Sequence, residues 1–181
     1  MVRVTELAYP AKSHRKKVTI PTESTKLAEF FGIVIGDGSI NNPWQANITL
    51  NAIADATYIE YVRNLTEELF GAKPRVMYRR ATNATIIFLA STTIVDFLVK
   101  KGLARGNKLA QGLRIPDWIL AVKAYKMACV RGLFDTDGCL ILARNGREIW
   151  LYSKKDVERY IHIIGSSNDR LLRVYRSWRG G

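Results

Sequence analysis

The chain is poor in the residues that build most metal centres and disulfide frameworks. Its 181 residues include only two cysteines and two histidines. His14 and His162 lie far apart without partners at metal-ligand spacing, so the sequence predicts neither a zinc site nor a disulfide framework. Cys129 and Cys139 are expected to be small core residues.

The sequence also lacks an apolar run of the roughly 18 residues that a membrane-spanning helix requires. Its first residues are polar and basic, with no apolar signal segment behind them, which predicts an intracellular protein of the cytoplasm or nucleoid. Hydrophobic residues make up 48% of the chain. That content suits one substantial core or two small pseudo-symmetric halves, and it argues against a disordered tail.

Acidic residues are scarce relative to basic ones. Lysine and arginine together number 28 against 16 aspartates and glutamates, which gives a formal net charge of +12. A basic domain of this size has the charge expected of a protein that binds a polyanion such as nucleic acid. Two alternatives remain open: a generally basic soluble protein, or one that binds acidic lipid.

One stretch of the chain is written twice, about one hundred residues apart. Residues 30–38 (FFGIVIGDG) recur as residues 130–138 (VRGLFDTDG), and each copy is a short apolar run that ends in Asp-Gly. An internal repeat predicts two equivalent structural units that meet at matched surfaces. The repeat would then bring two carboxylates, those of Asp37 and Asp137, to one place.

We interpret both copies as helices that end at the Asp-Gly pair, because a glycine just past a helix end tolerates the left-handed conformation. Gly32 and Gly36 share one helix face, and Gly132 and Thr136 repeat that spacing. Small residues let two helix backbones approach closely. An aspartate at a helix C terminus is typically unfavourable by about 0.3–1 kcal/mol, and two such aspartates repel each other. A divalent cation would relieve both penalties.

These residues resemble the LAGLIDADG homing endonucleases, in the form that carries two motifs on one chain. The positions that match the motif's glycine, catalytic acid and final glycine are Gly32, Asp37 and Gly38, and then Gly132, Asp137 and Gly138. Asp135 also fills the motif's first acidic position, which Ile35 replaces in the first copy. Residues 106–119 are similar to the family's connection into the second motif helix, and residues 164–168 to its closing segment.

The resemblance implies a site-specific endonuclease that uses Mg²⁺ to hydrolyse double-stranded DNA at a long, roughly asymmetric site. It further implies a monomer encoded within an intron, because the chain ends lack the residues of an intein. By the same resemblance, Asp37 and Asp137 would be catalytic and would bind the metal, with the backbone carbonyls of Gly36 and Thr136 as further ligands. The alternative is that both motif copies are only helix ends in a packed core.

A basic residue beside the attacking water is also implied by the resemblance. Lys154 and Lys155 are the candidates, because we expect them at the end of a strand near that position. The alternative for this lysine pair is a solvated face or a phosphate contact.

The predicted fold is α+β, with two pseudo-symmetric half-domains whose motif helices pack at their interface. Each half would present a DNA-facing antiparallel sheet backed by helices. We expect a basic lead-in over residues 1–24, a first half-domain over 25–115, and a shortened second half-domain over 116–181. The predicted elements are a helix over 25–37, a strand over 47–51, a helix over 55–70, a hairpin of 73–80 with 85–90, a helix over 94–101, the second motif helix within 116–136, a hairpin of 139–144 with 147–154, and helices over 156–164 and 170–178.

One face of the first sheet is expected to stay free of helices and to read DNA. Two alternating triplets would form it: Asn47, Thr49 and Asn51 on one strand, and Arg75, Met77 and Arg79 on another. Asparagine and arginine pair bidentately with base edges in the major groove, at about 1–3 kcal/mol of discrimination per pair. Further DNA contacts are predicted for Arg80, Arg144, Arg147, Arg15, Lys16 and Lys17. The alternative is an ordinary solvated sheet face.

The second half is short, so it would either read its half of the site loosely or have altered activity. The sequence leaves open whether this shortening requires dimerisation. The alternative function is a nucleic-acid-binding protein on the same scaffold without useful nuclease activity, such as an RNA maturase or a DNA-binding regulator.

Overall fold

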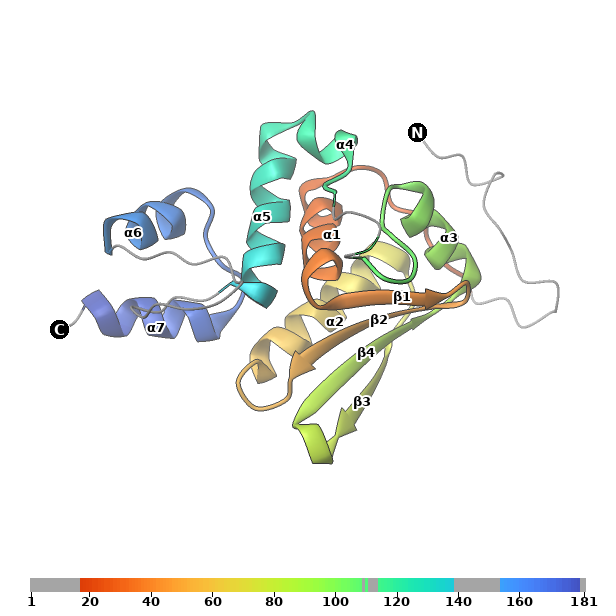
Figure 1. Ribbon diagram of the computed structural model, residues 1–181, viewed down its shortest axis with the longest axis horizontal. Coiled ribbons are helices and arrows are strands. Elements are labelled where there is room, and N and C mark those ends of the chain that lie inside the picture. Colours follow the sequence, from red (N-terminus) through yellow and green to blue (C-terminus); the bar gives the residue numbers. More distant parts are fainter. Residues whose placement is uncertain (1–16, 109, 111–113, 139–153, 180–181) are drawn as a thin grey trace.

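The computed structural model describes residues 17–108, 110, 114–138 and 154–179. These residues form an antiparallel four-stranded sheet with helices packed against it, and two further helices beyond (Figure 1). The predicted α+β class is therefore confirmed. The predicted hairpin of 139–144 with 147–154 lies almost wholly outside the described residues.

The elements follow the predicted order closely, with one strand that the sequence pattern did not indicate. They are α1 (Thr25–Asp37), β1 (Gly38–Asn42), β2 (Gln45–Asn51), α2 (Ala56–Phe70), β3 (Arg75–Arg79), η2 (Arg80–Thr82), β4 (Ala84–Ala90), α3 (Thr92–Lys100), α4 (Asp117–Leu120), α5 (Lys123–Asp137), α6 (Lys154–Ile163) and α7 (Asp169–Arg179). Strand β1 is the unexpected one, and the predicted second motif helix divides into α4 and α5.

Helix α1 runs through the middle of the main core. It begins where the Ser24 hydroxyl accepts a hydrogen bond from the Leu27 amide at 3.2 Å, the usual N-cap arrangement. All residues from Leu27 to Ile35 are buried, as expected of a helix that is apolar nearly all round. Helix α2 is amphipathic instead, and it ends at Gly71, whose φ of 61° places it in the left-handed region.

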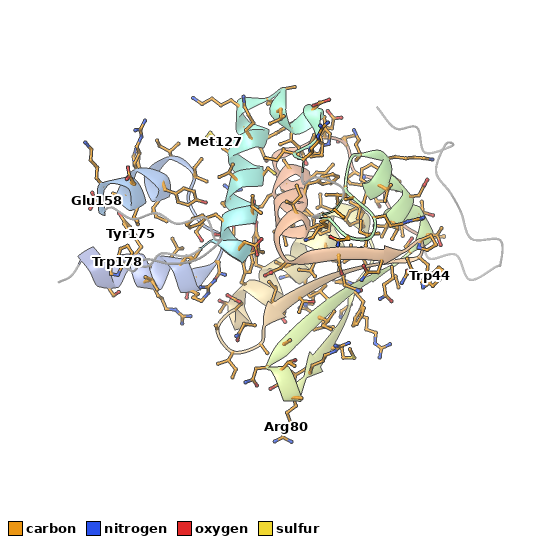
Figure 2. The ribbon with its side chains drawn as sticks, in the orientation of Figure 1. Trp44, Arg80, Met127, Glu158, Tyr175 and Trp178 are labelled. Atoms are coloured by element: carbon orange, nitrogen blue, oxygen red, sulfur yellow. The ribbon has the colours of Figure 1, made fainter. Side chains whose placement is uncertain are left out.

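The sheet has the order β1-β2-β4-β3, so β3 is an edge strand. Ala46, Ile48 and Leu50 of β2 are buried on the helix side, as alternation predicts. The β3–β4 hairpin extends past the helices, with Arg80 at its far tip and Trp44 at the opposite end of the sheet (Figure 2). Tyr78 of β3 is accordingly 53% exposed.

Helix α5 lies beside α1, and α6 and α7 lie on the far side of α5 from the sheet (Figure 1). A small second core joins these helices through buried Phe134, Val157 and Leu171. Partly buried Tyr175 and Trp178 of α7 pack against it. None of the helices described is both long and apolar enough to cross a lipid bilayer.

One predicted placement is wrong. Lys154 and Lys155 do not end a strand: they are the first two residues of helix α6. Asp156 follows them in the first turn, where a carboxylate is favourable against the helix dipole. The strand-end geometry that suggested a place beside the attacking water is therefore absent for this pair.

Candidate active site at the paired helix ends

The two motif helices pack backbone against backbone through matched glycines. A methyl group at Gly32 would overlap the carbonyl oxygen of Cys129, and a methyl group at Gly132 would overlap the carbonyl oxygen of Glu29. The two contacts are reciprocal, because each glycine meets the carbonyl three residues before the other. The repeat in the sequence thus forms a local two-fold arrangement of α1 and α5.

The glycines that follow the aspartates have a different role from the one predicted. Gly38 has φ −89° and Gly138 has φ −77°, so both are extended and neither needs the left-handed region. A methyl group at Gly38 would overlap Val34, and one at Gly138 would overlap Phe134. Glycine is therefore required because the chain leaves each helix close against its last turn.

Asp37 and Asp137 end the paired helices and interact with each other. A Cβ atom at Gly36 would lie 3.3 Å from the Asp137 Oδ2 atom, so the α5 carboxylate lies directly against the end of α1. Burial raises the pKa of Asp37 to about 6, with further increases from the charges of Asp137 and Asp55. The negative charge at this position is thus unfavourable in the folded protein.

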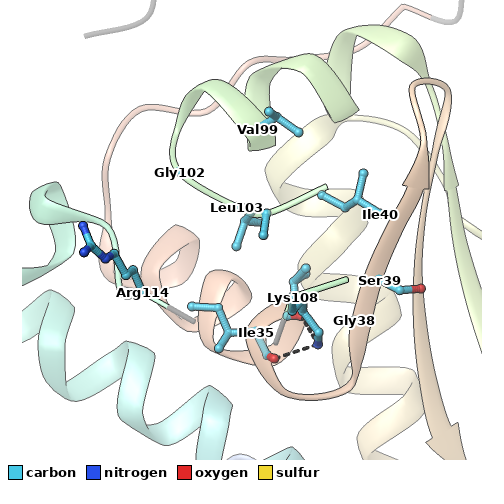
Figure 3. A pocket seen from close by; sticks show the side chains of 11 residues that line it. Ile35, Gly38, Ser39, Ile40, Val99, Gly102, Leu103, Lys108 and Arg114 are labelled. Atoms are coloured by element: carbon cyan, nitrogen blue, oxygen red, sulfur yellow. Dashed lines mark hydrogen bonds between the residues drawn. The ribbon is translucent and has the colours of Figure 1, made fainter. Parts of the chain in front are cut away.

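Lys108, from the segment between α3 and α4, places a cation at the end of α1. Its Nζ atom donates to the carbonyl oxygens of Ile35 at 2.8 Å and Gly36 at 2.7 Å (Figure 3), with a longer contact of 3.4 Å to Val34. Burial lowers the pKa of Lys108, while the charges of Asp37 and Asp137 raise it. The sequence pattern included Lys108 in a family-like segment but gave it no role.

The donor set suits a hard divalent cation. Two carboxylates meet at the negative ends of two helices, beside backbone carbonyls that already attract an ammonium group. No group of three or more His, Cys, Asp or Glu side chains gathers at metal distance in the part of the chain that the structure describes. A cation here would consequently need backbone oxygens in addition to Asp37 and Asp137.

Asp135, which fills the motif's first acidic position, anchors the closing segment. Its carboxylate accepts from the Ser166 hydroxyl at 2.5 Å and from the Ser167 amide at 2.6 Å. Burial raises its pKa to about 6, and these two hydrogen bonds partly oppose that increase. Ser167 also donates to Glu29 at 2.6 Å, which ties the segment to α1.

A second set of polar contacts joins α5, α7 and the start of α2. The Asn168 side-chain amide donates to the carbonyl oxygen of Asp135 at 3.0 Å and to Asp55 Oδ1 at 2.9 Å. Arg170 Nε donates to the same Asp55 oxygen at 2.9 Å. Asp55 and Arg170 were not predicted as site residues, although both affect the pKa of Asp37.

The residues predicted to read DNA share one face of the sheet. In each of three rows, a residue of β2, one of β4 and one of β3 lie side by side. The rows are Asn47–Phe88–Arg75, Thr49–Ile86–Met77 and Asn51–Ala84–Arg79. The face therefore has two outer strands with polar residues around a central apolar strand, while the opposite face carries the buried residues of β2.

Several predicted residues differ in how free they are. Asn51 accepts from the amides of Ile53 at 3.0 Å and Ala54 at 2.9 Å, so it builds the turn into α2. Lys17 is exposed ahead of the first helix. Arg15, Lys16, Arg144 and Arg147 lie outside the described residues.

No protein-family model matches the chain. The largest identity among the relatives described here is 32%, over 128 residues, with an A-type ATP synthase polypeptide from Pyrococcus abyssi; this is 66% of the present chain and 12% of that protein. A reverse gyrase from Methanocaldococcus jannaschii is 26% identical over 162 residues, 90% of this chain and 8% of that protein. The chain thus spans about a tenth of the length of these curated relatives.

Similar solved structures carry the family name to which the motifs pointed. Variants of the homing endonuclease I-DmoI match with a TM-score of 0.49 and 14% identity, covering 80% of this chain and 97% of that chain. The I-LtrWI LAGLIDADG homing endonuclease bound to target DNA matches with a TM-score of 0.33 and 13% identity, covering 77% of this chain and 58% of that chain.

Proposed function

We propose that the chain is a site-specific double-strand DNA endonuclease of the LAGLIDADG type that depends on a divalent metal, Mg²⁺. The observation that carries this proposal is the pairing of Asp37 and Asp137 at the ends of two helices held together by reciprocal glycine contacts. A packed core alone does not explain why two repelling carboxylates stand together there.

In this proposal the chain's own residues position a phosphodiester and hold the charges around it. Asp37 and Asp137, with the carbonyls of Gly36 and Thr136, would hold the metal, which polarises the phosphodiester, helps generate hydroxide and stabilises the leaving oxygen. The glycine contacts fix the distance between the two carboxylates. The net charge of +12 draws the DNA backbone, and the open sheet face contacts bases.

The two curated relatives support a mobile unit. Their names describe unrelated activities, and the shared segment makes up only 12% and 8% of their lengths. We infer that this segment is a separate unit within each of those proteins, which suits an element that spreads between genes. The predicted encoding within an intron remains part of the proposal.

One observation favours the alternative function, a nucleic-acid-binding protein without nuclease activity. Lys108 already occupies the carbonyl oxygens at the end of α1, as it would in a descendant that had exchanged its metal for a lysine. Incubation of the protein with plasmid and randomised duplex DNA, with Mg²⁺ and with chelator, separates the two functions. The endonuclease nicks or cuts DNA only with Mg²⁺, whereas the alternative protein binds DNA and leaves it intact.

A further inference from the structure

The ammonium group of Lys108 has the position and the contacts of a bound cation. It contacts the last carbonyls of α1 at 2.7 and 2.8 Å, where those oxygens form the negative end of the helix dipole. Both Asp37 and Asp137 interact with its charge. Lys108 thus neutralises the same groups that the proposed metal would neutralise.

The two motif helices differ in this respect. The carbonyl of Ile35 on α1 accepts from a charged ammonium, whereas the matching carbonyl of Asp135 on α5 accepts from the neutral side-chain amide of Asn168. The pseudo-symmetry of the sequence would give the two ends equal partners. Lys108 is therefore a specific feature of the first half and is not required by helix capping in general.

Space exists for the lysine to move. A cavity of about 300 Å³ lies beside the end of α1, and Lys108 is part of its lining (Figure 3). Residues of α1, β1 and the segment after α3 form the rest of the wall, among them Ile35, Ser39 and Leu103. A flexible four-carbon side chain could rotate into this cavity without moving the backbone.

We propose that Lys108 is an internal counter-ion of the α1 end, and that it must leave the Gly36 carbonyl before that oxygen can bind a divalent cation. This inference rests on the proposed metal-dependent function. Lys108 acts here as a positioning residue: it keeps the paired carboxylates compensated in the metal-free protein and yields its place when metal is bound. Lys108 would thereby set the metal concentration at which the site fills.

The first test measures binding of Ca²⁺ alone to the DNA-free protein by titration calorimetry. Lys108→Met should bind Ca²⁺ at least about tenfold more tightly than the wild type, because a close positive charge and a competitor are both removed. Lys26→Met is the control: Lys26 pairs with Glu68 on the surface, and its loss should leave the affinity unchanged. Equal or weaker binding by Lys108→Met, or no binding by either protein, would overturn the proposal.

A second test needs no variant. Acetylation of the wild-type protein by acetic anhydride, followed by mass spectrometry, reports the accessibility of each lysine. Ca²⁺ should increase the modification of Lys108 several-fold and leave that of Lys26 unchanged; an unchanged Lys108 would show that it keeps its contacts and would refute displacement. If both tests succeed while the protein cuts no DNA with Mg²⁺, the counter-ion role stands and the proposed nuclease function fails.

Discussion

Asp37 is the side chain at which the unfavourable terms of the site meet. Burial, the charge of Asp137 and the charge of Asp55 all raise its pKa, to about 6. In the unfolded chain this carboxyl has its ordinary pKa of 3.8. The folded state therefore binds the proton more tightly, and the stability that Asp37 contributes is present at low pH and is lost as the pH rises from 3.8 through about 6.

This sign gives a prediction for stability. Asp37→Asn should increase the free energy of unfolding in metal-free buffer at pH 7 by on the order of 1 kcal/mol, because it removes a charge that the fold disfavours. The gain should shrink towards zero at pH 4, where the folded wild type holds Asp37 protonated. Chemical denaturation of both proteins at several pH values measures it.

A matched control keeps that result specific. Glu60→Gln removes an exposed carboxylate of α2 that pairs with Arg63, and it should change stability little at any pH. A gain for Asp37→Asn that did not depend on pH, or a loss at pH 7, would contradict the account of the paired carboxylates.

The sequence identified the acids but not the groups around them. Asp37 and Asp137 follow from a repeated pattern, which is visible in one dimension. Lys108, Asp55 and Arg170 come from segments far from the motifs, and only the fold brings them to the helix ends. Asn51 had the alternation of an exposed strand residue, yet its local hydrogen bonds to the following turn cannot be inferred from that pattern.

The helices and strands were largely predictable because their signals are local. Alternation located β2, and the apolar period with Gly71 at its end located α2. Strand β1 was missed because its five residues, GSINN, contain one large apolar side chain. The lysines at 154 and 155 were misplaced because a charged pair that follows a predicted strand fits a strand end and a helix start equally well.

Close packing of α1 on α5 leads to a second prediction. Alanine usually stabilises a helix interior by up to about 1 kcal/mol relative to glycine. Gly32→Ala and Gly132→Ala should instead destabilise the fold by about 3 kcal/mol or more, because each methyl group would overlap a backbone carbonyl of the partner helix.

Thermal and chemical denaturation of the two glycine variants test this reversal. Asn64→Ala, on the exposed side of α2, is the control and should change stability by less than about 0.5 kcal/mol. If either glycine variant were as stable as the wild type, the helices could not be in backbone contact at that position.

The open sheet face leads to a third prediction. Arg75→Ala and Arg79→Ala should each relax base preference at a few neighbouring positions, by about 1–3 kcal/mol per position. Binding to a library of duplexes with single base changes measures this. Arg63→Ala, on α2, should leave base preference unchanged. A uniform loss of affinity on all sequences would mean that Arg75 and Arg79 contact phosphates and do not read bases.

The molecule as a whole is strongly basic and unequal in its two halves. Its charge of +12 predicts that affinity for DNA falls steeply as salt increases, because bound counterions are released from the phosphates. The first half carries the four-stranded sheet, whereas the second half is described only through α5, α6 and α7. How the second half reads DNA rests on the predicted hairpin of 139–144 with 147–154.

This inequality gives a fourth prediction. A monomer should tolerate base substitutions far better on one side of the cut than on the other, because a two-stranded ribbon brings fewer side chains to base edges than a four-stranded sheet. Profiling cleavage of every single-base variant of a target site measures the tolerance. A palindromic profile with equal tolerance on both sides would instead indicate a symmetric dimer.

The central claim is that Asp37 and Asp137 form one metal-dependent cleavage site. The most direct test incubates the wild type, Asp37→Asn and Asp137→Asn with a randomised duplex library and Mg²⁺, and sequences the cleaved ends. The account predicts that the wild type cuts both strands at a defined site, that chelator stops it, and that each variant loses double-strand cleavage while still binding the selected site. Cleavage of both strands by either variant at near wild-type rate, or an inert wild type that binds DNA, would contradict it.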